Sequence, residues 1–370
     1  MRLATFNVEN MFDRPAIMNL PKWSDGRKVL EDFADLTNLA EKDSYSAADK
    51  SRMLTIMDRN TGLLTAGKSK YIALNKIRGS FLKKPKGKPA EIVANGRSSW
   101  IGWFELRKEH VEETAIENTA RVINEVNADV LCVVEADNRI VLTRFNEQVI
   151  PKVGGQQYDH AMLIDGNDER GIDVGIMTRR DYPIESIVSH VYDTDAGGTV
   201  FSRDCAEYRV ATPSGRTLLV LVNHFKSKGY GPPSESNARR ERQARQARKI
   251  YDERLQAGFE YIVVAGDLND TPDGAPLAPL LADGALVDIM AHPSFAGDGR
   301  PGTHGNGNKS GKLDYILMSP KVAQAVQAGG IERRGVWGGT HGTLFPHFPE
   351  IEEEKDAASD HAALWVDLNL

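Results

Sequence analysis

Residues 128–135 read Ala-Asp-Val-Leu-Cys-Val-Val-Glu, an apolar run that ends in the carboxylate of Glu135. A short run rich in valine and leucine is typical of a buried β-strand. Six further runs of strand length have similar composition: Leu3–Val8, Val174–Met177, Leu218–Val222, Tyr261–Ala265, Tyr315–Met318 and Ala363–Val366. A buried strand has no need of a carboxylate at its end, so Glu135 requires an explanation beyond packing.

Two segments between these runs have helical character. Glu109–Asn127 carries apolar side chains near a 3.6-residue period, and Ala238–Gln256 is rich in Arg, Gln and Ala. Segments rich in Gly, Pro, Asp and Asn predict loops at 193–198, 229–233, 270–276 and 297–311. Strands mixed with helices predict an α/β protein in which helices cover β-sheets.

Polar residues suited to metal or phosphate flank all seven strand-like runs. They are Asn7 and Glu9; Glu135; Arg170 and Asp173; Asn223, His224 and Lys226; Asp267 and Asn269; Asp314; and Asp360 and His361. Each one alone is more simply explained as a turn residue, a cap or an ion-pair partner. Together they favour one site, because carboxylates clustered without a cation would repel each other and raise their own pKa values.

The carboxylates of this set predict a divalent metal. Glu135, Glu9 and Asp360 offer hard oxygen ligands, which suit one or two Mg²⁺ or Mn²⁺ ions. No Cys/His spacing indicates structural zinc. Such an ion would polarise a phosphoryl oxygen and stabilise the leaving oxyanion.

The remaining polar residues predict the other parts of a phosphoester-hydrolysing site. The groups that can donate hydrogen bonds to phosphate oxygens are Asn7, Asn269, Arg170 and Lys226. Asp267 is the candidate that orients or deprotonates the attacking water. His361 and His224 can donate to phosphate or move protons near neutral pH, and Asp314 is the candidate that orients His361.

The ordered motifs resemble the endonuclease/exonuclease/phosphatase superfamily, which includes DNase I-like nucleases, apurinic endonucleases, sphingomyelinases and inositol-phosphate phosphatases. The segments that carry the resemblance are TFNVEN at 5–10, ADVLCVVE at 128–135, GIDVG at 171–175, NHFKS at 223–227, GDLND at 266–270, KLDYIL at 312–317 and SDH at 359–361. They follow the family's order from end to end of the chain, apart from residues 14–108. Glu9 stands where apurinic endonucleases carry Asp.

The resemblance implies a single domain over residues 1–370, a four-layer α/β/β/α sandwich of two packed mixed β-sheets flanked by helices. It implies in-line attack of water on a phosphoester with one or two divalent metals. By position, Glu135 is similar to the principal metal ligand, and Asp360 to a second metal or metal-water ligand. By the same resemblance, Asp267 and Asn269 position water and phosphate, and Asp314 and His361 are the acid–imidazole pair. His224 is similar to the additional histidine of the DNase I-like and sphingomyelinase branches. The Asn-His-Phe-Lys-Ser form is similar to that of bacterial extracellular-type nucleases and favours DNA or RNA.

Residues 14–108 are expected to be an insertion or elaborated loop within that domain. The segment has a possible helix at Ala47–Arg59 and a basic run from Lys76 to Lys88, followed by Trp100, Trp103 and Phe104. It can be a solvated hairpin decorated with lysines, or a clamp in which lysines neutralise phosphates and tryptophan offers a stacking face.

Composition limits the classes of function. The net charge of −6 means that nucleic acid would have to be bound by a local basic patch rather than by bulk charge. One such patch is the stretch from Lys226 to Lys249, in which Arg242, Arg245 and Lys249 would share a helix face; the alternative is a solvated helix. Two cysteines are no disulfide framework, and no secretory signal or membrane span is evident, so a cytoplasmic protein that does not contact a membrane is expected.

Three hypotheses for function follow. The first is a nuclease with nucleic acid as its partner, and the second is a phosphodiesterase or phosphatase for a small or lipid-linked phosphoester. The third, a scaffold that has lost the chemistry, is disfavoured because Glu135, Asp267, Asn269, Asp360 and His361 are all present.

Overall fold

The structure is a computed structural model, and it describes residues 1–11, 17, 23–85, 87–107, 113–168, 171–229 and 232–370. The chain divides into two compact units. The first consists of Met1–Phe12 and Val111–Leu370, and the second of Asp13–His110. All residues for which the sequence predicts chemistry belong to the first unit.

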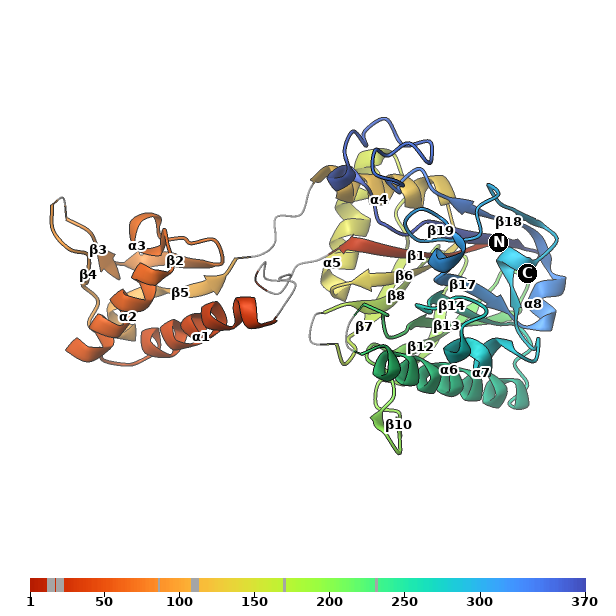
Figure 1. The fold of residues 1–370 in the computed structure, drawn as a ribbon, viewed down its shortest axis with the longest axis horizontal. Helices are drawn as coiled ribbons and strands as arrows, with labels where there is room; N and C mark the ends of the chain where they lie inside the picture. The colour runs from red at the N-terminus through yellow and green to blue at the C-terminus, as the bar shows by residue number, and fades with distance from the viewer. Residues whose placement is uncertain (12–16, 18–22, 86, 108–112, 169–170, 230–231) are drawn as a thin grey trace. The chain divides into compact units, whose positions relative to one another are not determined.

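Two mixed β-sheets form the centre of the first unit (Figure 1). One has seven strands in the order β16 (Phe295–Ala296), β18 (Val326–Glu332), β19 (Ala363–Leu368), β1 (Arg2–Met11), β6 (Val130–Ala136), β8 (Asp173–Thr178) and β7 (His160–Ile164). The other has six strands in the order β15 (Val287–Asp288), β17 (Asp314–Met318), β14 (Ile262–Asp267), β13 (Thr217–His224), β12 (Cys205–Ala211) and β9 (Ile184–Val188). The segment predicted as a loop at 193–198 contains a small hairpin, β10 (Thr194–Asp195) with β11 (Gly198–Thr199).

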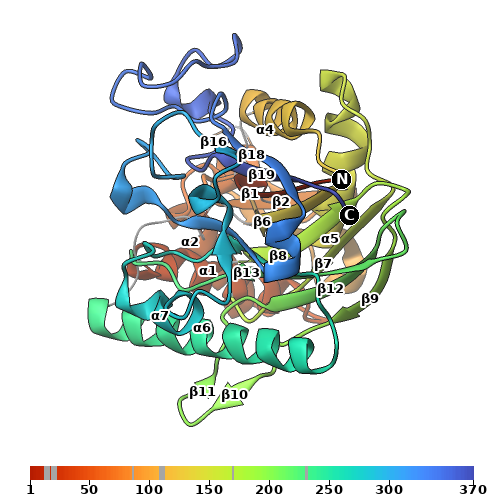
Figure 2. The same ribbon diagram turned by 90° about the vertical axis from the view of Figure 1, so that its right-hand side faces the viewer.

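Helices cover the outer face of each sheet, and Figure 2 shows α4 and α6 on opposite sides of the strands. The helix α4 (Glu113–Val126) packs on the seven-stranded sheet, and α6 (Pro233–Gln256) packs on the six-stranded sheet. The short helices of this unit are α5 (Arg139–Arg144), α7 (Ala278–Leu281), α8 (Pro320–Gln324), the π-turn η3 (Phe145–Val149) and the 3₁₀ turns η4 (Pro151–Val153), η5 (Ala275–Leu277), η6 (Ile289–Ala291), η7 (Lys309–Gly311) and η8 (Glu354–Asp356). The predicted four-layer α/β/β/α sandwich is confirmed.

The inner core explains why the apolar runs are continuous rather than alternating. Each sheet buries one face against the other sheet and the opposite face against helices, so both faces of a central strand need apolar side chains. In β6, Val130, Cys132 and Val134 pack between the sheets, while Leu131 and Val133 pack towards the helices. All seven strands predicted from such runs are present.

Strand direction brings the polar strand ends to one edge. In each of the parallel pairs β1–β6 and β13–β14 the two strands end side by side, so the residues at their ends lie close together. The strands β17 and β19 run antiparallel to β14 and β1, so it is their beginnings that lie at this edge. Asp267 at the end of β14 is therefore the register partner of both His224 and Asp314.

The second unit has a hydrophobic core of its own. Its helices are α1 (Trp23–Ala40), α2 (Ala47–Arg59) and α3 (Leu63–Ala66), with the 3₁₀ turn η2 (Arg97–Ser99). Its strands pair as β2 (Ile72–Gly79) with β5 (Trp100–Leu106) and β3 (Leu82–Lys83) with β4 (Glu91–Ile92). Leu36, Met53, Phe81, Trp100 and Phe104 are buried together. The structure shows that this segment is a compact unit, the helix predicted at Ala47–Arg59 is confirmed, and the single domain with an insertion at 14–108 stays a prediction.

None of the helices in the described part of the chain combines the length and apolar character that a membrane span requires.

Gly266 allows β14 to approach the end of β13 closely. Its φ is +123°, and a Cβ at this position would lie 2.0 Å from the carbonyl oxygen of Asn223. Glycine alone adopts such a backbone angle readily and leaves this space free.

We therefore expect Gly266→Ala to lower the free energy of unfolding by more than about 2 kcal/mol, because backbone strain adds to a backbone clash. Gly215→Ala is the matched control, since Gly215 also has a positive φ of +77° but nothing within 4 Å of its Cβ position. The control should lose about 1 kcal/mol. Differential scanning calorimetry compares the two, and equal losses would contradict the close-approach argument.

Candidate active site

The polar residues at the shared sheet edge form one continuous cluster. Ligand atoms of Glu135, His224 and Asp267 lie within 4.8 Å of one another, and so do those of Asp267, Asp314 and His361. Asp267 belongs to both groups and is 2% exposed, so it is the centre of the cluster. Residues more than two hundred positions apart in the sequence therefore meet as the strand-end pattern predicted.

Asp267 is held in place by amide groups. The backbone N–H of Asn269 donates to Oδ1 at 2.8 Å, and the Asn269 side-chain amide donates to Oδ2 at 3.1 Å. The amide of Asn7 donates to the same Oδ2 at 3.3 Å. Burial raises the pKa of Asp267 to about 7, although the charge of His361 acts in the opposite direction. A carboxylate with this pKa can accept a proton near neutral pH.

His361 is oriented by a chain of hydrogen bonds. Its Nδ1 lies 2.7 Å from Oδ2 of Asp314, which also accepts a hydrogen bond from the Thr303 hydroxyl at 2.6 Å. Its Nε2 faces the cluster and lies 3.9 Å from Oδ2 of Asp267. Burial lowers the pKa of His361, but the Asp314 carboxylate outweighs burial and holds that pKa well above its ordinary value. The imidazole is thus a proton donor at neutral pH.

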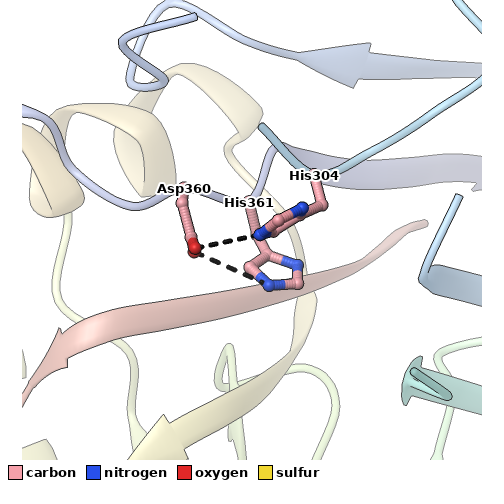
Figure 3. A group of neighbouring side chains, drawn as sticks. All are labelled: His304, Asp360 and His361. Carbon is pink, nitrogen blue, oxygen red and sulfur yellow. Dashed lines mark hydrogen bonds and ion pairs between the residues drawn. The ribbon is translucent and has the colours of Figure 1, made fainter. Parts of the chain in front are cut away.

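Figure 3 shows a third group beside this chain, formed by His304, Asp360 and His361. The Nε2 atom of His304 lies 3.0 Å from Oδ2 of Asp360, and the two imidazole rings lie 4.7 Å apart. Burial would raise the pKa of Asp360, but the two histidines outweigh it and lower that pKa to about 2. The backbone N–H of Asp360 donates to Glu9 at 2.9 Å, which joins this group to the end of β1.

Sequence reasoning missed His304 and Thr303. Both lie in the Gly-rich segment 297–311, where no strand pattern marks them, and an isolated β-bridge joins His304 to His361. A histidine in a loop rich in Gly and Asn was the one available signal.

The described residues place the other predicted site residues as follows. The Nε2 atom of His224 lies 3.5 Å from Glu135 and 3.7 Å from Asp267. Lys226 follows the end of β13, and its backbone N–H donates to Gln243 at 2.8 Å, so a role of its ammonium group at phosphate stays a prediction. Arg170 lies outside the described residues.

Backbone strain is concentrated at this edge. Four described non-glycine residues have a positive φ, and three of them are Glu9 (31°), Glu135 (67°) and Asn269 (55°). Positive φ in such residues costs about 1–3 kcal/mol each and persists where the surroundings enforce it. The site thus holds these side chains in backbone conformations that they do not prefer.

The donor set fits a hard divalent cation. Burial raises the pKa of Glu9 to about 7 and also raises the pKa of Glu135, and in both cases neighbouring carboxylates contribute in the same direction. Such excess negative potential is what a bound cation relieves. Glu135, Asp267 and the amide oxygens of Asn7 and Asn269 supply oxygen ligands of the kind that Mg²⁺ and Mn²⁺ prefer.

The basic stretch predicted beside the site forms ion pairs along α6. Arg242 pairs with Asp195, Arg245 with Glu241, and Lys249 with Glu253. Its positive charge is therefore largely neutralised within the first unit.

Comparison with known proteins places this fold and site in a family. The family model described as "Endonuclease/Exonuclease/phosphatase family" matches residues 112–361. None of the curated protein sequences matches the chain.

The solved structures to which this chain is similar have low sequence identity to it. A mannosyl-6-phosphatase from Bacteroides thetaiotaomicron is 16% identical, with 69% of this chain and 91% of that chain covered and a TM-score of 0.51. A truncated TDP2 from Caenorhabditis elegans is 15% identical, with 69% and 89% covered and a TM-score of 0.47. The human Nocturnin catalytic domain with bound sulfate is 16% identical, with 68% and 86% covered and a TM-score of 0.48.

The match to the family model extends from α4 to His361 and covers most of the chain. The chain therefore belongs to the endonuclease/exonuclease/phosphatase family, whose members hydrolyse phosphoric esters and generally use divalent metal ions.

Proposed function

We propose that the chain is a Mg²⁺- or Mn²⁺-dependent phosphodiesterase whose substrate is nucleic acid. The observation that carries the chemistry is the convergence of Glu135, Asp267 and His361 on one cluster, with Asp314 holding His361 at 2.7 Å. Glu135, with Asp267 and Glu9, would hold the cation, and a cation bound there would polarise a phosphoryl oxygen and stabilise the leaving oxyanion.

Three protein side chains would supply the remaining catalytic groups. Asp267, fixed by Asn269 and Asn7, orients the attacking water beside the cation and is placed to accept its proton. His361, protonated beside Asp314, donates a hydrogen bond from Nε2 to a phosphoryl oxygen. His224 lies between Glu135 and Asp267 and can donate to a second oxygen.

The choice of nucleic acid rests on residues 13–110. This segment contains 19 Lys and Arg against 12 Asp and Glu, a formal charge of +7. A basic module tethered to a phosphodiesterase favours a polyanionic substrate.

A small or lipid-linked phosphoester is the second candidate. The observation that favours it is the acidic character of the catalytic unit, in which 27 Lys and Arg stand against 40 Asp and Glu, a formal charge of −13. Salt dependence separates the two, because turnover of nucleic acid should fall steeply as salt rises whereas turnover of a small ester should not.

The proposed chemistry predicts cleavage of DNA or RNA with Mg²⁺ or Mn²⁺ that stops when a chelator is added. Asp267→Ala and His361→Ala should each lower kcat by at least about a hundredfold, since each removes a group that acts on the reacting atoms. The panel of substrates is plasmid, single-stranded DNA, RNA, abasic duplex and bis-p-nitrophenyl phosphate. Asp273→Asn is the matched control, because Asp273 is an exposed partner of Lys309. Full activity in both site variants would refute the assignment.

The electrostatic account of the metal site predicts an unusual stability effect. The folded protein raises the pKa of Asp267, so it binds this proton more tightly than the unfolded chain does. Asp267 therefore destabilises the metal-free protein increasingly as the pH rises from about 4 to about 7. In EDTA at pH 8, Asp267→Asn should melt a few degrees above the unsubstituted protein, and the difference should shrink at pH 5.

Differential scanning fluorimetry measures both melting temperatures with and without metal. Mg²⁺ or Mn²⁺ should raise the melting temperature of the unsubstituted protein and have little effect on Asp267→Asn. A variant that melts lower than the unsubstituted protein in EDTA at pH 8 and still responds fully to metal would contradict the site.

A further inference from the structure

The excess positive charge of the second unit is concentrated in residues 68–107, which form its β-strands and the turns between them. Between Lys68 and Arg107 the sequence has 10 basic residues and 2 acidic ones, Glu91 and Glu105. The helices carry nearly equal numbers of acidic and basic residues, and several of these form ion pairs. Arg27 pairs with Glu31, Lys28 with Asp32, and Arg52 with Asp35. The helical side therefore leaves little charge for a partner, whereas the sheet side has an excess.

The cations of the sheet are available to a ligand. Within the described ranges, Lys76, Arg78, Lys83 and Lys84 form no ion pair with a carboxylate. Lys76 and Arg78 are exposed on β2. This differs from α6, where Arg242 and Arg245 are paired with carboxylates, so the sheet of the second unit is the stronger site of attraction for a polyanion.

The outer face of the β2–β5 sheet exposes apolar side chains. The inner face buries Trp100 and Phe104 in the core, so alternation along β5 turns Ile101 and Trp103 outwards. Trp103 is 45% exposed and Ile101 47% exposed. Ile77, at the irregularity in β2, is 69% exposed. Of the aromatic residues predicted for stacking, Trp103 alone is free to do so, because Trp100 and Phe104 are core residues.

Polar groups surround this apolar centre. Register places Asn75 opposite Trp103 and Arg78 opposite Ile101 on the same face. The one carboxylate of the face, Glu105, accepts a hydrogen bond from the amide of Asn75. An aromatic ring bordered by a guanidinium and an amide matches a base with its phosphate. Insertion into a bilayer would instead take these polar groups into an apolar layer, so nucleic acid fits the face better than a lipid surface does.

We propose that the outer face of the β2–β5 sheet, centred on Trp103 and Arg78, binds single-stranded DNA or RNA and recruits it to the chain. The identity of the polyanion rests on the proposed function. Single strands are favoured over duplex because only an unstacked base can lie on the Trp103 ring. Because both units belong to one chain, nucleic acid bound at this face has a higher local concentration at the catalytic unit.

The test measures binding by the full chain in EDTA, where no turnover occurs. The probes are a fluorescein-labelled oligothymidylate and the matching oligouridylate, followed by fluorescence anisotropy. Trp103→Ala should weaken binding about tenfold and Trp103→Phe should restore most of it, because a stacking ring returns. Arg78→Glu should flatten the slope of log Kd against log salt by about 0.7, the value for one phosphate contact on a single strand.

Arg52→Glu is the matched control, because it changes the net charge equally on the helical side of the same unit. It should leave Kd within about twofold. Equal weakening by Arg78→Glu and Arg52→Glu would overturn the proposal, and so would unchanged binding in Trp103→Ala. Binding to vesicles made of phosphatidylserine and phosphatidylcholine is measured for the same variants. Loss of vesicle binding in the face variants with oligonucleotide binding intact would also overturn it.

Hydrolysis of bis-p-nitrophenyl phosphate separates this inference from the proposed function. All face variants should hydrolyse it at the rate of the unsubstituted protein. If the protein binds oligonucleotide through this face yet cleaves no nucleic acid, the proposed function fails and the binding face stands. If it cleaves nucleic acid but Trp103→Ala and Arg78→Glu bind and cleave normally, the binding face fails alone.

Discussion

The active-site edge is organised by the burial of like charges in one place. Glu135, Asp267 and Glu9 lie close together with raised pKa values, and each would be more stable in water. The protein opposes this repulsion with groups that cannot move away: the amides of Asn7 and Asn269 and the imidazole of His361. The residual negative potential is the driving force for cation binding, and the cation in turn would be the attraction for phosphate.

The fold supplies the rigidity that this arrangement needs. Apolar side chains on both faces fix the register of β1, β6, β13 and β14, and most of the functional residues stand at or near the ends of these strands. The positive φ values at Glu9, Glu135 and Asn269 show that the chain turns abruptly there. Strain at these turns is tolerated because the strands before them are anchored in the core.

Prediction from the sequence succeeded best for buried central strands that end in a polar functional residue. Central strands such as β6 and β13 are continuous apolar runs, so they and the polar residues after them could be predicted. Strands with exposed or charged positions were not predicted, as in β9 and in β12, which contains Glu207 and Arg209. The helix α1 was also missed, and with it the compactness of residues 13–110. His304 and Thr303 reach the site through a loop bridged to His361, a contact that no local pattern encodes.

The central claim is that the carboxylate cluster is a metal site, and anomalous X-ray diffraction from crystals grown with Mn²⁺ addresses it most directly. The account predicts the strongest anomalous peak within about 2.1 Å of a Glu135 carboxylate oxygen, with Asp267 or Asn7 in the same coordination shell. Manganese bound elsewhere, with Glu135 and Asp267 hydrogen-bonded only to protein and water at saturating metal, would contradict it.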